Sequence, residues 1–443
     1  MNVDFYDVRI TEGTMTTIMV DNGKVEEISS SFNKGAAVRA LIGGSWGFVS
    51  TDDITRVDKA IEDASTLARK MNAKKPRDKV ILAQCGTEHI SEVAQVLKDP
   101  QNIPIEDKVS LLMDIEEHMK LPRIHSTSIM YLQGSAVSSY YNSEGLECDR
   151  TTTHCGCAIT AVAKNGSAYQ ASRESRFGVK GFELFDENDF FKLAEHAAST
   201  ADSLLDASAP KGGTMPVILD PELAGVFIHE AVGHASEADI VLEGGSCLEG
   251  KLGEKIASGN LRVIDDPTFK GYGYYTFDSE GSKAKKTTII DNGFLNSYLH
   301  NRETAGKLGG EPCNARAQGM SVPVVRMSNT YIDNGDSSFE EMCREIKDGI
   351  YLIGSRGGQV NPAEGVFQFN AERGFLIKDG EISMPLRDVS LAGNTIDILQ
   401  NILLIGKDLT MNSGRCGKSG QSVPVSDGSP HIAISKAVVG GSG

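Results

Sequence analysis

The chain has 443 residues, of which 44 are Lys or Arg and 60 are Asp or Glu, so its formal net charge is −16. This acidic balance disfavours binding to the phosphate backbone of nucleic acids. The hydrophobic content of 40% and the charged content of 23% are typical of a soluble globular protein, and the length exceeds what one core usually supports. We therefore expect two domains and no nucleic-acid partner.

No segment of the sequence predicts a membrane anchor or an export signal. The first residues, Met1 to Tyr6, lack a basic start followed by an apolar core, and no apolar run reaches membrane-spanning length. The eight cysteines are scattered without the regular spacing of a disulfide scaffold. We expect a cytoplasmic protein without a membrane partner, in which the cysteines are thiols.

The first part of the sequence combines strand and helix patterns. It opens with short strands joined by turns at Asp21-Asn22-Gly23 and Gly43-Gly44. Apolar residues at three- and four-residue steps then predict a helix from about Asp52 to Met71. A second helix is expected between Pro104 and Pro122.

A run of antiparallel strands is expected from Ile124 to about Val179, where Ser, Thr, Tyr and Val are frequent. This region contains His154-Cys155-Gly156-Cys157, whose side chains are of the types that bind metals. Strand alternation places the two cysteines on a face that continues with Ile159 and Ala161. That apolar face favours a role in the core over a metal site.

A domain boundary is expected near residue 209. An Ala-rich helix pattern from about Asp186 to Ala207 is followed by Ala209-Pro210-Lys211-Gly212-Gly213, whose composition is typical of a linker. We therefore predict an α+β fold with an N-terminal domain of helices and antiparallel strands over residues 1–209. A β-rich C-terminal domain over residues 210–443 would carry the helix with the functional motif.

Local patterns in the second domain predict several short elements. Met215 to Leu219 is expected to form a strand, with Asp220 capping the helix that follows. A short helix near residues 338–347 would turn Cys343 inward as a packing residue. The segment Gly354 to Gln359 is interpreted either as a flexible loop or as a place where the backbone closely approaches a substrate.

The helix after Asp220 contains the motif His229-Glu230-Ala231-Val232-Gly233-His234. Imidazole is a common zinc ligand, and a carboxylate beside a ligand can act on a metal-bound water. Two ligands of a zinc-peptidase helix usually stand four residues apart, but these stand five apart. Since a fifth residue leaves the two rings about 140° apart, we expect the helix to end between them or to carry a one-residue bulge, which Gly233 permits. The alternative is a buried helix with two hydrogen-bonded histidines.

A catalytic zinc site usually has three protein ligands, so a third is needed. The candidates are Glu237, Asp239, Cys247, His300, Cys313, Cys416 and His431. Small neighbouring residues leave the Cys416 thiol accessible, and nearby cations favour its thiolate form. These properties do not by themselves decide among the candidates.

Other catalytic classes find no motif. No stretch has the strand, glycine and helix order of a phosphate-binding loop or a dinucleotide fingerprint. No Gly-x-Ser-x-Gly elbow of a serine hydrolase occurs. The metal site is therefore the functional hypothesis that the residues support.

Several segments together resemble the TldD/PmbA family of zinc metallopeptidases, once described as modulators of DNA gyrase. They are Gly35 to Ala40, Phe227 to Asp239, Tyr298 to Arg302, Arg326 to Thr330, Gly357 to Val360 and Cys416 to Pro424. The resemblance implies that the His-Glu-x-x-x-His motif marks a TldD-type active subunit, because PmbA-type (TldE) partners lack it. It also implies that His229, His234 and Cys416 bind one Zn²⁺ per chain and that Glu230 is the catalytic residue.

The resemblance further implies a dimer with a cleft that admits extended peptides or unfolded proteins. The second subunit would be another copy of the chain or a PmbA/TldE-like protein. The expected reaction is attack of a metal-activated water with Glu230 as general base, and His300 or a tyrosine would stabilise the oxyanion. The alternative function is that of a non-enzymatic, metal-stabilised regulatory subunit of a larger complex.

Overall fold

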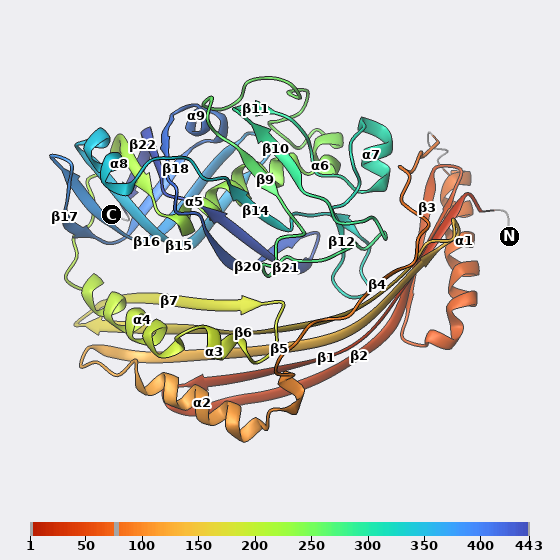
Figure 1. Ribbon diagram of the computed structural model, residues 1–443, viewed down its shortest axis with the longest axis horizontal. Helices are drawn as coiled ribbons and strands as arrows, with labels where there is room; N and C mark the ends of the chain where they lie inside the picture. Colours follow the sequence, from red (N-terminus) through yellow and green to blue (C-terminus); the bar gives the residue numbers. More distant parts are fainter. Residues whose placement is uncertain (1–2, 75–78, 442–443) are drawn as a thin grey trace.

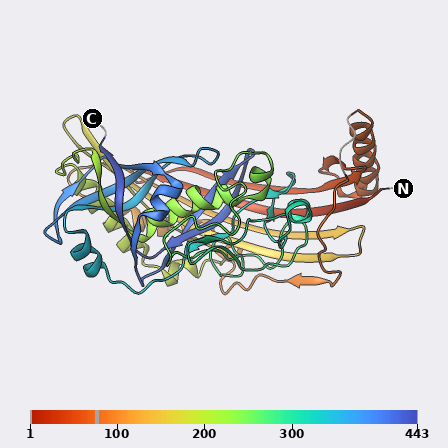
Figure 2. The ribbon, with the colours of Figure 1, turned by 90° about the horizontal axis from the view of Figure 1, so that it is seen from above.

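The computed structural model describes residues 3–74 and 79–441. A long, curved sheet from the N-terminal half cradles the β-rich C-terminal half on its concave side (Figure 1). Seen from above, the α1 end of this sheet extends away from the C-terminal half (Figure 2). In the described part of the chain, no helix is both long enough and apolar enough to cross a membrane.

The N-terminal sheet has the order β3-β2-β1-β5-β6, with β4 and β7 both paired to β6. Its strands are β1 (Phe5–Asp21), β2 (Lys24–Ile42), β3 (Ser45–Thr51), β4 (Ile90–Glu92), β5 (Ile124–Asn142), β6 (Glu147–Asn165) and β7 (Ala168–Gly178). The predicted turns at Asn22-Gly23 and Gly43-Gly44 are confirmed, but the prediction of short strands is wrong, because β1 has 17 residues and β2 has 19. No turn signal or proline interrupts either run, so the ladder continues.

Helices cover the convex face and one end of this sheet (Figure 1). They are η1 (Ile54–Arg56), α1 (Val57–Lys74), η2 (Pro100–Asn102), α2 (Ile105–Glu117), α3 (Leu184–Glu187) and α4 (Phe190–Leu204). The helix predicted over 186–207 is divided in two, because Asp189 caps α4 by accepting a hydrogen bond from the Lys192 N–H. Cys155 and Cys157 are fully buried in the core beneath α4, which confirms their interpretation as packing residues.

Two sheets form the C-terminal half. In the first, β15, β8, β22, β18 and β16 close into a ring, with β17 and β19 at its edges. Its strands are β8 (Gly213–Leu219), β15 (Gly349–Asn361), β16 (Val366–Lys378), β17 (Glu381–Leu386), β18 (Val389–Asn394), β19 (Ile402–Ile405) and β22 (Ile432–Gly441). Gly354 to Gln359 lies within β15, so the loop interpretation is wrong: the strand absorbs the glycines at a register shift between Ser355 and Gly358.

The second sheet has the order β11-β10-β9-β14-β21-β20. Its strands are β9 (Val263–Asp265), β10 (Thr287–Asp291), β11 (Phe294–Leu295), β14 (Asn329–Ile332), β20 (Thr410–Lys418) and β21 (Gln421–Ser429); β12 (Ala315–Arg316) and β13 (Val324–Val325) pair separately. Short helices complete this half: α6 (Ala238–Leu242), α7 (Arg302–Leu308), α8 (Phe339–Ile346) and α9 (Thr395–Gln400). Cys343 on α8 is buried, as predicted. Helices and antiparallel sheets in one chain confirm the α+β class.

Helix α5 (Pro221–Ile228) lies between the two C-terminal sheets. The predicted cap is confirmed, since Asp220 accepts a hydrogen bond from the Leu223 N–H at 2.8 Å. Phe227 and Ile228 are fully buried in the core that both sheets share. Gly225 allows close contact with β21, because a Cβ at this position would lie 2.9 Å from the Gly428 nitrogen. The helix is thus fixed on both sides where the motif begins.

Candidate metal centre

The helix changes its winding at the motif. Beyond α5 the chain forms a π turn over His229–Gly233 and then a 3-10 turn over His234–Ser236. A π turn accommodates one more residue than an α turn, which offsets the five-residue spacing. The two imidazole rings have centroids 5.4 Å apart. Of the two predicted geometries, the one-residue bulge is therefore confirmed.

Cys416 joins the two histidines from β20. Its Sγ lies 3.4 Å from His234 Nε2, although the two residues are 182 positions apart in the sequence. One potential ligand atom from each of His229, His234 and Cys416 lies within 4.8 Å of the others, and all three residues are buried. We call these three residues the ligand group.

The ligand group favours the form of cysteine that binds metals. Burial alone would raise the pKa of the Cys416 thiol, but His229 and His234, by charge and hydrogen bonding, lower it to about 4. Two imidazoles and a thiolate are typical ligands of zinc. His229 Nδ1 is also buried without a hydrogen-bond partner, so an added cation would meet an unsatisfied site.

Glu237 contacts the ligand group from behind. His234 Nδ1 donates a hydrogen bond to Glu237 Oε2 at 2.9 Å, and Lys418 Nζ lies 3.1 Å from the same oxygen. Burial would raise the pKa of Glu237, but His234 and Lys418 lower it, so the carboxylate stays charged. This contact fixes the tautomer of His234 and leaves Nε2 available, as is usual for metal-binding histidines.

The other predicted third ligands lie elsewhere. Asp239 pairs with Lys418, Cys247 lies against Gly365, His300 hydrogen-bonds Thr304, Cys313 contacts Asn314, and His431 hydrogen-bonds Asp408. The structure therefore brings only Cys416 and Glu237, among these described candidates, next to the histidine pair. Glu237 already accepts two hydrogen bonds, which favours Cys416 as the third ligand.

Glu230 lies beside the ligand group and reaches solvent. Its Oε2 is 3.9 Å from His234 Nε2, and its side chain is 35% exposed, against 11% for His234. The carboxylate thus faces an accessible space while the ligand group is enclosed. A substrate group that enters this space would contact Glu230 first.

Two further residues at the centre were not singled out from the sequence. Asp427 on β21 is buried with Oδ1 unpartnered, and burial raises its pKa to about 6. Strand alternation would have identified it, because Asp427 shares a strand face with Val423, which pairs with Cys416. Arg326 is fully buried and donates a hydrogen bond to the Cys416 carbonyl. No pattern in the sequence pointed to that contact.

Gly233 gives the π turn its room. A Cβ on Gly233 would lie 1.9 Å from Sδ of the fully buried Met327. Overpacking of this kind costs about 1–3 kcal/mol, more than the roughly 1 kcal/mol that alanine gains in a helix. We expect Gly233→Ala to lower the free energy of unfolding by about 1–2 kcal/mol, measured by denaturant titration. Gly417→Ala is the control, since a Cβ there meets no atom within 4 Å; equal effects would contradict the packing argument.

Three family models match the chain. They describe domain 1, the central domain and the C-terminal domain of PmbA/TldA metallopeptidases and match residues 6–68, 98–205 and 212–441. The chain belongs to the PmbA/TldD metallopeptidase family. A "Metalloprotease" of Methanothermobacter thermautotrophicus is 42% identical, over 99% of this chain and 96% of the relative. A "Zinc metalloprotease TldD homolog" of Saccharolobus solfataricus is 32% identical, over 100% of this chain and 97% of the relative.

Solved structures share the fold of this PmbA/TldD chain. A Thermotoga maritima protein described as a modulator of a DNA gyrase superimposes with a TM-score of 0.82 at 20% identity, covering 98% of this chain and 96% of that one. TldE from Thermococcus kodakarensis superimposes with a TM-score of 0.79 at 21% identity, covering 99% and 97%. At these identities the likeness establishes the fold.

Proposed function

We propose that this chain is a TldD-type zinc peptidase. In this proposal His229, His234 and Cys416 bind one Zn²⁺ per chain, and Glu230 is the general base. The observation that carries it is the ligand group at the π turn, with an exposed carboxylate beside it. The relatives named as metalloproteases support the same class of enzyme, and one of those names specifies zinc.

The residues of this chain have separate roles in the proposed reaction. When bound, zinc lowers the pKa of a water molecule and polarises the scissile carbonyl. Glu230 takes the proton of the attacking water on its carboxylate and delivers it to the leaving amine. Glu237 holds His234 in the tautomer that presents Nε2. Arg326 fixes the backbone of Cys416 through the carbonyl of that residue.

The proposed substrates are extended peptides and unfolded proteins, and the proposed assembly is a dimer in the cytoplasm. The partner would be a second copy or a PmbA/TldE-like chain, with which this chain shares its fold. The β1–β2 hairpin supports an interface, because Val25, Ile28 and Phe32 of β2 are 41%, 47% and 60% exposed. The domain division at residue 209 stays a prediction from the sequence.

The experiment compares one protein in its folded and permanently unfolded forms as substrates of the zinc-loaded chain, alone and with a PmbA-like partner. We expect mass spectrometry to detect cleavage of the unfolded form, loss of that cleavage with a chelator, and survival of the folded form. An enclosed site accepts a backbone only when it is extended. Comparable cleavage of both forms would contradict the substrate class, and no cleavage under any condition would favour the regulatory-subunit alternative.

A further inference from the structure

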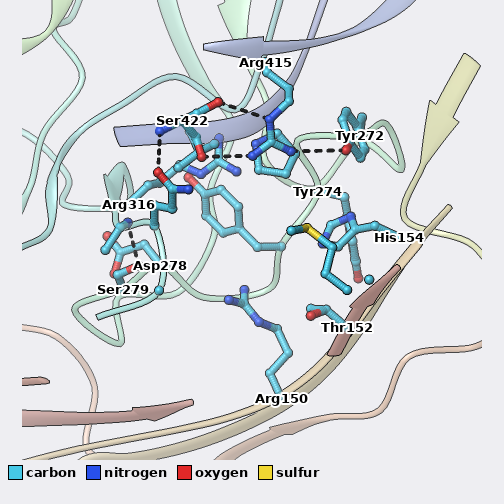
Figure 3. A pocket seen from close by; sticks show the side chains of 18 of the residues that line it. Arg150, Thr152, His154, Tyr272, Tyr274, Asp278, Ser279, Arg316, Arg415 and Ser422 are labelled. Carbon is cyan, nitrogen blue, oxygen red and sulfur yellow. Dashed lines mark hydrogen bonds between the residues drawn. The ribbon is translucent and has the colours of Figure 1, made fainter. Parts of the chain in front are cut away.

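A second site lies between the two halves of the molecule. A cavity of about 280 Å³ separates the concave face of the N-terminal sheet from the C-terminal half (Figure 3). Strand β6 contributes Arg150, Thr152 and His154, alternate residues that share one strand face. The opposite wall carries Arg316 of β12 and Arg415 of β20. We call this cavity the arginine pocket.

The three guanidinium groups of the arginine pocket have no ion-pair partner among the described residues. Arg150 donates to the Phe277 carbonyl at 3.1 Å, and Arg316 donates to the Met327 carbonyl at 2.7 Å. Arg415 donates to Ser422 Oγ at 3.1 Å. Other enclosed arginines of this chain differ, since Arg39, Arg123 and Arg302 each pair with a carboxylate. Neutral acceptors orient the guanidinium groups but leave their charges unbalanced.

The carboxylates near the arginine pocket are occupied elsewhere. Asp278 lines the cavity, but it accepts backbone hydrogen bonds from Glu280 at 2.8 Å and from Ala315 at 3.0 Å, and burial raises its pKa. Glu92 accepts a hydrogen bond from Thr276 Oγ1 at 2.6 Å. The concentration of positive charge is notable in a chain whose net charge is −16.

Two polar atoms in the pocket wall lack partners. Arg150 Nε and His154 Nδ1 are buried without a hydrogen bond. Burial and the three arginines lower the pKa of His154 to about 4, so the imidazole is neutral at pH 7 and can donate one hydrogen bond. His154 also packs edge-on against Tyr272, which in turn stacks on Phe177, so its ring is held in place. Buried polar atoms without partners cost stability unless a ligand supplies them.

We propose that the arginine pocket binds an oxyanion, a carboxylate or phosphate group, at a site separate from the candidate metal centre. Guanidinium groups match the geometry of both anions, and a bound anion would balance the unpaired charges. The oxyanion has two possible sources, a small free anion and the terminal or side-chain carboxylate of a peptide. This inference does not depend on peptidase activity.

Strand β20 separates the two sites. Ser413 of β20 accepts a hydrogen bond from the Phe177 N–H of the N-terminal sheet at 3.0 Å, so this strand face is directed toward that sheet. Arg415 lies on the same face by strand alternation, whereas Cys416 projects to the opposite face and contacts His234. The arginine pocket therefore lies behind the strand that supplies the proposed cysteine ligand.

The test measures binding to the full-length protein by calorimetry at constant ionic strength. The probes are inorganic phosphate, succinate, a short peptide with a free C-terminus and the same peptide as its amide. We expect at least one anionic probe to bind, and Arg150→Gln and Arg316→Gln to raise its dissociation constant about tenfold or more, since each removes a charged hydrogen-bond donor. Arg69→Gln removes an exposed charge on α1 and should have no effect.

The outcomes separate the two sources and can overturn the proposal. Binding of phosphate or succinate with no difference between peptide and amide assigns the pocket to a free anion, and preference for the peptide over its amide assigns it to a peptide carboxylate. Absence of binding by every probe overturns the proposal, as does an equal effect of Arg69→Gln. If the arginine variants do not fold, Thr152→Glu places a competing carboxylate in the pocket. Unchanged anion binding by Thr152→Glu would also overturn the proposal.

Discussion

Glu230→Gln is expected to leave the fold and the zinc content intact while it lowers peptide turnover by about ten-thousandfold, the upper end of what a general base contributes. Glutamine has nearly the same size as glutamate but cannot take a proton. Glu230 is exposed and lies outside the ligand group, so neither metal binding nor packing requires its charge. Because the carboxylate acts on the water, kcat should fall far more than KM changes.

Zinc content and turnover have to be measured on the same preparation of Glu230→Gln. Glu243→Gln is a matched control, because Glu243 is an exposed carboxylate just after α6. The control variant should retain normal turnover. Near-normal cleavage by a fully metallated Glu230→Gln protein would rule out the proposed mechanism, and loss of activity in proportion to lost zinc would make Glu230 a structural residue.

Cys416→Ala is expected to weaken zinc binding by well over the roughly ten- to hundredfold that follows loss of a partner behind a ligand. The variant removes the thiolate and leaves two imidazoles, which is fewer than the three protein ligands of a usual catalytic site. Zinc per chain and competition with a chromophoric chelator measure the effect. Turnover should be lost together with the metal.

Cys343→Ala is the control for Cys416→Ala, because Cys343 is also a buried cysteine but packs in a separate core cluster on α8. It should lose some stability and no zinc affinity. If Cys416→Ala folds and keeps stoichiometric zinc at native affinity, the third ligand has been misassigned. Glu237 would then be the first alternative, since it lies closest to His234 among the remaining candidates.

Local signals in the sequence predicted local structure well. The Asp220 cap, the turn at Asn22-Gly23 and the inward face of Cys343 each depend on a few neighbouring residues, and the structure confirms them. The length of β1 was not predictable in the same way, because pairing with β2 and β5 sustains it along its whole length. Nor was the strand structure of Gly354 to Gln359, which depends on pairing with β16.

The candidate site shows the same division between local and distant information. The spacing of His229 and His234 required an irregular helix, and the π turn is what the chain adopts. Spacing could not select Cys416 from the other candidates, because only the β20–β21 pairing carries it to His234. The resemblance to a family supplied that residue. Asp427 was missed because a lone Asp in a strand looks like any solvated residue until its burial is known.

The π turn also limits how this motif can be exchanged with others. Deleting Val232 would restore a four-residue spacing, but it would rotate everything from His234 onward by about 100° relative to α5. That exit path is anchored on both sides, because Ser236 donates to the Gly233 carbonyl at 2.8 Å and the Ala238 N–H donates to the Leu299 carbonyl at 3.0 Å. A shorter zinc-binding helix therefore cannot be grafted here as a module, since the insertion and the route of the following chain form one inherited unit.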